Sequence, residues 1–184
     1  MIAEGAMGRE QVEAAFGINI GDALHWNVKW TAKYFLGDWT AEQIDAGEAG
    51  LPFDVREADG NLLVNTGIGL LLDLLIGAGG TVFSNANAYL GIGDSNTAAA
   101  AGQTDLQAAT NKVRHAMDAT FPSRSSQTLT FRSTFSTSEG NFSIQEQGTF
   151  NASSAGTMLN RKVTDLGTKT SASTLQLSMA ITIS

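Results

Sequence analysis

The stretch TLQLSMAITIS, residues 174–184, alternates large apolar side chains with polar or small ones, without a break. Its large apolar residues are Leu175, Leu177, Met179, Ile181 and Ile183. Because successive side chains of a β-strand point to opposite faces, all five lie on one face of a sheet. Such a strand must be paired and buried, since it would otherwise be a template for aggregation. We therefore expect a fold built around a sheet that this strand completes, with no flexible tail after it.

The same alternation predicts further strands upstream. It recurs in residues 24–34, 128–135 and 142–150, and residues 88–92 and 158–163 favour two more short strands. Closely spaced strands joined by Ser- and Gly-rich turns are typical of an antiparallel meander, sandwich or jelly roll. The predicted fold is mainly β (α+β): an antiparallel β-sandwich or jelly-roll-like domain with two helices and an extended N-terminal arm.

Two segments carry the capping-box spacing, in which Ser or Thr is followed three residues later by Glu or Gln. Thr40 and Gln43 predict a short helix within residues 38–50. Residues 104–118 begin with the same spacing and predict a second, amphipathic helix. The apolar side of this second helix consists of Leu106, Ala109, Val113, Ala116 and Met117.

Residues 61–78, NLLVNTGIGLLLDLLIGA, predict the longest helix of the chain. Asn65 or Thr66 can cap its start, and Gly77 can end it after Ile76. Leucines cover nearly every side of this helix, and a helix that is apolar all round is buried on most faces. We expect it to lie across a sheet or between subunits.

The 184 residues suit one domain with a single core, and without cysteine that core depends on packing alone. The formal net charge of -7 comes from residues 1–60, which contain eleven acidic and four basic residues, whereas residues 61–184 contain seven of each. A negative surface repels phosphate backbones, so nucleic acid is not an expected partner. The turn Asp59-Gly60 places a boundary near residue 60. It would divide an acidic N-terminal arm (1–60), with one strand and short helices, from a β-rich core domain (61–184).

The sequence predicts neither a secretory signal nor a membrane span. Glu4, Glu10 and Glu13 interrupt the apolar residues of the N-terminus, where residues 9–16 favour a short helix. The apolar stretch 67–78 is shorter than the roughly 20 residues that a bilayer needs.

Residues that could carry chemistry are few. His25 and His115 have no metal-binding spacing, and Asp73 lies on the one polar stripe of its predicted helix. Glu139 and Glu146 could pair across a hairpin as glycosidase carboxylates, but nothing around them indicates a sugar cleft. We therefore do not expect an enzyme, and we expect no catalytic, cofactor-binding or metal-binding residues.

Two segments, residues 70–112 and 156–184, contain the motifs YLGIGDS, TDLQAATNK and LNRKV ahead of the final alternating strand. In these motifs the chain resembles a family of small structural proteins of tailed bacteriophages. The resemblance spans roughly residues 61–184, and it includes no catalytic motif. It implies a component of the virion, made in the host cytoplasm.

Within the virion, a small acidic domain with an N-terminal arm resembles a capsid cement or decoration protein. Such proteins bind the exterior of the head shell, commonly as trimers, and clamp neighbouring subunits of the major capsid protein. The resemblance therefore implies two partners, the major capsid protein and further copies of this chain, with the arm reaching over an adjacent subunit. Many weak contacts in parallel then raise the avidity.

Two alternatives stay open. The first is a tail or fibre-attachment structural protein, which would be present in far fewer copies than a cement protein. The second is a glycan-binding module that uses Trp26 and Trp30 on the strand of residues 24–34. Because aromatic residues are common in strands and cores, we expect these two tryptophans to belong to the core.

Overall fold

The computed structural model describes residues 25–184, and this part of the chain contains ten strands and two helices. One sheet, sheet A, consists of β1 (Trp26–Leu36), β2 (Asp54–Asp59), β6 (Ser123–Ser125), β7 (Thr128–Phe135) and β10 (Ser173–Ile183). The other, sheet B, consists of β3 (Leu62–Leu63), β4 (Tyr89–Gly93), β5 (Lys112–Ala116), β8 (Ser143–Phe150) and β9 (Met158–Thr168). The helices are α2 (Ala41–Asp45) and α3 (Asn65–Ile76).

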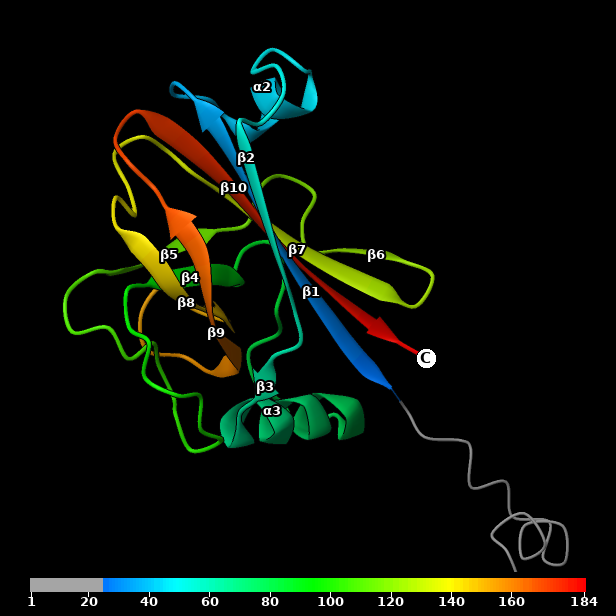
Figure 1. Ribbon diagram of the computed structural model, residues 1–184. Helices are drawn as coiled ribbons and strands as arrows, with labels where there is room; N and C mark the ends of the chain where they lie inside the picture. The colour runs from blue at the N-terminus through cyan, green and yellow to red at the C-terminus, as the bar shows by residue number, and fades with distance from the viewer. Residues whose placement is uncertain (1–24) are drawn as a thin grey trace, which may run out of the picture.

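The two sheets face each other across a shared core, as Figure 1 shows. The strand order is β2-β1-β10-β7-β6 in sheet A and β3-β9-β8-β4-β5 in sheet B. All paired strands are antiparallel. The predicted mainly β, sandwich-like fold is confirmed.

β10 is the central strand of sheet A, and the prediction that this strand is paired and buried is confirmed. It pairs with β1 from Trp26 opposite Ile183 to Leu36 opposite Ser173, and with β7 on its other side. Leu175, Leu177 and Met179 have no exposed surface, and the neighbouring Ile181 has almost none. The apolar face of the alternating strand is therefore the centre of the core.

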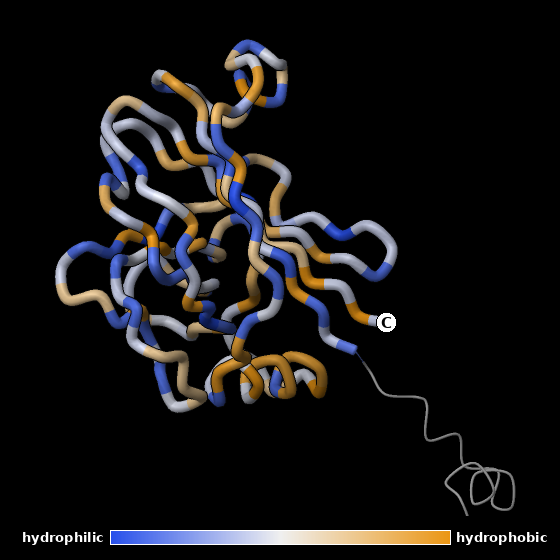
Figure 2. Tube along the Cα trace, viewed as in Figure 1, coloured by the Kyte–Doolittle hydropathy of each residue, from blue (hydrophilic) through white to orange (hydrophobic). Residues whose placement is uncertain are grey.

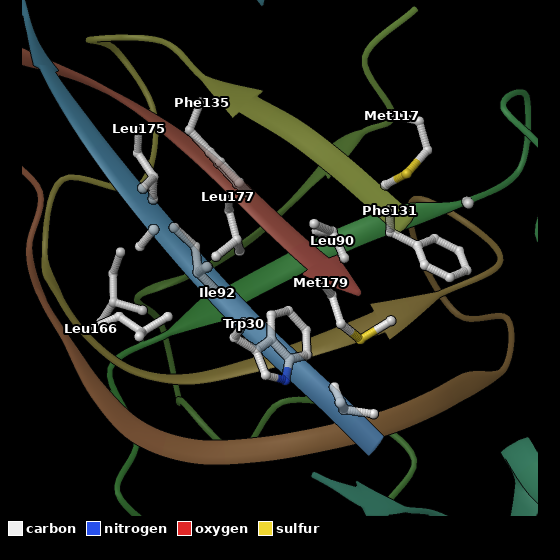
Figure 3. Close-up of a cluster of buried hydrophobic side chains, with 14 of the residues drawn as sticks. Trp30, Leu90, Ile92, Met117, Phe131, Phe135, Leu166, Leu175, Leu177 and Met179 are labelled. Carbon is white, nitrogen blue, oxygen red and sulfur yellow. The ribbon is translucent and has the colours of Figure 1, made fainter. Parts of the chain in front are cut away.

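One hydrophobic core fills the space between the sheets (Figure 3). Trp30 of sheet A and Leu90 and Ile92 of sheet B are completely buried in it. Tyr34 ties the two sheets together, because its hydroxyl donates a 2.7 Å hydrogen bond to the carbonyl oxygen of Leu166 on β9. Burial raises the pKa of this hydroxyl, so it remains a donor.

Residues 104–118 do not form the predicted helix. β5, which lies within them, pairs with β4 at the edge of sheet B, and the residues before it form turns and loops. The amide nitrogen of Gln107 donates to the carboxylate of Glu146 and not to a helical carbonyl. Pairing with a distant strand therefore overrides a local helical pattern.

The predicted boundary near residue 60 does not separate an arm from a core. β1 and β2 precede it, yet β1 pairs with β10 at the centre of sheet A and β2 pairs with β1. Residues 26–59 thus belong to the same sandwich as the rest. The charged sequence DVREAD of β2 is typical of an edge strand, where charges hinder pairing with other chains. The helix predicted for residues 9–16 lies outside the described residues.

α2 is the short helix predicted from the capping box. The Thr40 hydroxyl accepts from the amide of Gln43, and the Gln43 side chain accepts from the amide of Thr40. Together with α3 it accounts for the two helices of residues 25–184. Neither of them has the length and apolar character that crossing a membrane requires.

α3 has the predicted extent but not the predicted cap. Gly77 follows its last residue with a φ of 73°, in the left-handed region that glycine adopts readily. Neither Asn65 nor Thr66 caps its start. Val64 occupies the cap position, and it makes no side-chain hydrogen bond to the first turn.

Candidate assembly surface

α3 approaches sheet B through one close backbone contact. A Cβ atom on Gly67 would collide with the backbone of Leu159 on β9, so glycine is required for this approach. Only Gly67 and Leu70 of the helix are buried. The expectation of a helix buried on most faces is therefore wrong for the single chain.

Four large apolar side chains of α3 are exposed to solvent. Their exposed fractions are 41% for Ile68, 57% for Leu72, 81% for Leu75 and 77% for Ile76. Figure 2 shows α3 as a mostly hydrophobic (orange) element at one end of the molecule. Single exposed apolar residues are common on protein surfaces, but a contiguous group of this kind marks an interaction site.

An apolar groove of about 500 Å³ lies between α3 and the end of sheet A. Its apolar walls are formed by Leu71 of α3, Trp26 of β1, Leu129 of β7, and Ile181 and Ile183 of β10. Arg124 on β6 also lines it and is the only charged side chain that does so among the described residues. The groove thus combines an apolar floor with one positive charge.

The groove and the exposed side of α3 form one continuous apolar surface. Leu71 and Leu75 are one helical turn apart and therefore lie side by side, with Ile68 and Leu72 next to them. By the same geometry Asp73 lies on the other flank of the helix. We call the combined region the assembly surface. It comprises Ile68, Leu71, Leu72 and Leu75 of α3 with Trp26, Leu129, Ile181 and Ile183 of sheet A.

A second group of exposed apolar side chains lies at the opposite end of β1. It comprises Leu36, Leu51, Phe53 and Val55. The ring of Phe53 lies 6.2 Å from that of Tyr34, centroid to centroid, so this group borders the far end of the core.

The buried polar residues Glu146 and Arg161 stabilise the fold. Glu146 and Arg161 are completely buried, and the Arg161 Nε lies 2.7 Å from the Glu146 Oε2. The same carboxylate accepts from the amides of Gln107 and Ala108, and the guanidinium donates to the carbonyl of Thr97. The pair therefore fastens the segment of residues 94–111 to sheet B.

This ion pair is not among the contacts that the sequence predicts. Glu146 faces Val163 in the register of β8 and β9, so its contact with Arg161 is diagonal and depends on the pairing of the strands. No local pattern reveals such a contact. Glu146 is buried against Arg161, whereas Glu139 lies beside His115, so the two carboxylates have different partners.

Of the other candidate residues, His115 and Glu139 are brought together, whereas His25 and Asp73 lie on other elements. His115 is on β5, not on a helix, and its Nδ1 lies 3.0 Å from the carboxylate of Glu139. The backbone of His25 pairs with Ser184 at the end of sheet A. Asp73 is exposed on α3. Within residues 25–184, no three acidic or histidine side chains are grouped so that they could hold a metal ion.

The two tryptophans of β1 belong to the core, as predicted. Trp30 is completely buried, and Trp26 is partly buried and packs against the core cluster. Trp30 therefore offers no surface to a glycan. Trp26 instead contributes one wall of the groove.

Comparison with known protein families, with curated proteins and with solved structures found no match to this chain. The resemblance to phage structural proteins therefore stays a prediction from sequence motifs.

Proposed function

We propose that the protein is a structural subunit of a bacteriophage virion, a capsid cement protein that binds the exterior of the head shell. The observation that carries the proposal is the assembly surface, in which an apolar groove continues into the exposed side of α3. The motifs of residues 61–184 that resemble small virion proteins support it. The partners are further copies of this chain and the major capsid protein.

Attachment would depend on the burial of apolar area that the fold holds at the surface. Covering a leucine such as Leu75 contributes about 1.5–3 kcal/mol. One contact of this size is weak, but a shell repeats it many times, and linked contacts raise the avidity without any large interface. The sandwich and α3 hold the backbone that carries these side chains, so only side-chain freedom is lost when a partner orders them.

A cement subunit has to contact two kinds of neighbour. The assembly surface includes Trp26 and the second group of exposed apolar residues includes Leu36, so the two lie at opposite ends of β1. Two apolar surfaces on opposite ends of one domain match that requirement. This arrangement supports binding to a second copy at one end and to the shell at the other.

Copy number in purified virions tests the proposal. A cement protein should be present in a number close to that of the major capsid protein, as measured by quantitative mass spectrometry of intact particles. A few to a few dozen copies would indicate the tail component, and complete absence from virions would contradict a virion role altogether.

Leu75→Lys tests whether the assembly surface mediates attachment. The side chain is mostly exposed, so the fold should persist, whereas a charge on the apolar surface should reduce occupancy on particles about tenfold or more. Gly69→Lys is the matched control, because it adds the same charge to open space elsewhere on α3. Equal occupancy of both variants would remove the assembly surface from the proposal.

A further inference from the structure

The groove of the assembly surface lies where the described chain begins. Its lining includes Trp26, the first residue of β1, and Ile183 and Ser184 at the end of β10. The amide of His25 donates to the carbonyl of Ser184 over 2.7 Å, and the amide of Ser184 donates back to His25 over 3.1 Å. Residues 1–24 therefore join the molecule at the rim of the groove.

His25, the first residue that the structure describes, is paired with Ser184 at the end of sheet A, so the segment of residues 1–24 is attached beside the groove. The exposed side of α3 next to the groove is an apolar area of the kind that a second molecule covers. A second copy seated there would hold its own residues 1–24 close to this groove.

The sequence of residues 1–24 fits an apolar groove with one positive charge. It contains several large apolar residues, among them Val12, Phe16, Ile18 and Ile20. It also contains four acidic residues and one basic residue, which complements Arg124. With about 3.3 Å per extended residue, 24 residues can reach up to about 80 Å, enough to span a neighbouring subunit.

We propose that the groove between α3 and sheet A receives the N-terminal segment, residues 1–24, of a second copy of this chain. Because each copy both gives a segment and receives one, the contact links copies into a reciprocal pair, into a ring where its rotation closes, or into an open filament where it does not. The inference rests on the proposed function only in assigning a role to this linkage. The linkage itself is a property of the purified protein.

Two full-length variants test the exchange. Phe16→Asp with Ile20→Asp damages the segment and leaves the groove intact. Ile183→Asp places a charge in the groove at a partly exposed position and leaves the segment intact. Each variant alone should associate about a hundredfold more weakly than the native chain, because an unpaired carboxylate would have to be buried. Size-exclusion chromatography with light scattering gives the association.

An equimolar mixture of the two variants gives the decisive result. The intact groove of one can accept the intact segment of the other, so the mixture should form a one-to-one complex that neither variant forms alone. Thr182→Asp is the matched control for Ile183→Asp, since it adds the same charge one residue away on the opposite face of β10. That control should associate like the native chain. A mixture that remains monomeric would overturn the proposal.

A second measurement covers the case in which Ile183→Asp does not fold. A photoreactive amino acid at position 129 lines the groove, and native-length chains carrying it are mixed from ¹⁴N- and ¹⁵N-labelled preparations. Cross-links from position 129 to residues 1–24 should join light to heavy chains. Cross-links within one isotope only, or none to this segment, would contradict exchange between copies.

These assays contain no virions, so the two proposals can fail separately. Exchange between purified chains that are absent from particles would contradict the proposed function alone. A monomer that fully occupies particles would contradict the exchange alone.

Discussion

Two segments pack on the outside of the sandwich. They differ in how fully the single chain pairs or buries their side chains. The segment of residues 94–111 lies over the outer face of sheet B and is held by the buried pair of Glu146 and Arg161. α3 touches the sandwich closely at Gly67 and leaves most of its apolar side chains in water. We call residues 94–111 with the buried pair the polar cover, and α3 the apolar cover. The single chain supplies the charged partners of the polar cover, but it leaves one side of the apolar cover exposed.

The difference separates residues that stabilise the fold from residues available to a partner. A buried carboxylate and guanidinium must find their partners inside the molecule, because unpaired buried charges are very costly. Exposed leucines carry a smaller cost that a second molecule can relieve. We therefore expect changes under the polar cover to affect folding, and changes on the open side of α3 to affect association.

The largest effect should come from Glu146→Gln. This change leaves the guanidinium of Arg161 buried without its counter-charge, and breaking a buried pair in this way typically costs about 3–5 kcal/mol. Urea unfolding followed by circular dichroism measures the loss.

The same substitution at Glu57 is the matched control. The side chains of Glu57 and Lys29 form an ion pair of similar length, 2.9 Å, but both are half exposed. Glu57→Gln should leave the urea midpoint almost unchanged. If the two substitutions had equal effects, the polar cover would not depend on the buried pair.

A smaller effect is expected on the close side of α3. Gly67→Ala places a Cβ atom against the backbone of Leu159, and overpacking of this kind costs about 1–3 kcal/mol. Gly69→Ala in the same helix meets open space and should stabilise the protein by about 0.5–1 kcal/mol through helix propensity. Thermal unfolding of both variants checks the opposite signs. A stabilising Gly67→Ala would show that α3 can move away from β9.

The same contrast explains what the sequence could predict. Alternation along β10 and the capping box at Thr40 are local patterns, and both elements are present where they predict them. α3 has its predicted extent because Gly77 ends it locally. Its exposure was not predicted, since apolar composition shows that a surface needs cover but not whether the same chain provides it.

Residues 104–118 show a local pattern that predicts the wrong element. Leu106 and Val113 have helical spacing, but Glu146 binds the backbone next to Leu106 and β4 pairs with Val113. Both interactions join residues far apart in the sequence, so a local pattern cannot contain them. The groove was missed for the same reason, because its lining comes from five elements that only the fold brings together.

The smallest effect should come from Asp105, at the exposed margin of the polar cover. Burial alone would raise the pKa of this carboxyl, but hydrogen bonds from Arg114, Lys112 and the amide of Leu106 outweigh it, and the pKa lies below its ordinary value of 3.8. A lowered pKa means that the folded protein favours the charged form. The resulting stabilisation is present above pH 3.8 and is lost as the pH falls through the lower, folded pKa.

Asp105→Asn should therefore lower the free energy of unfolding at neutral pH, and the gap to the native chain should close on acidification below pH 3.8. Because the side chain is 42% exposed, water screens the ion pairs and the gap should stay below about 1 kcal/mol. Urea unfolding at a series of pH values measures it. A gap that widened towards acid pH would mean that burial, and not the two cations, controls this carboxyl. Asp105 would then resemble the exposed leucines of α3. In both cases the chain would hold a side chain in an unfavourable environment without offsetting the free-energy cost.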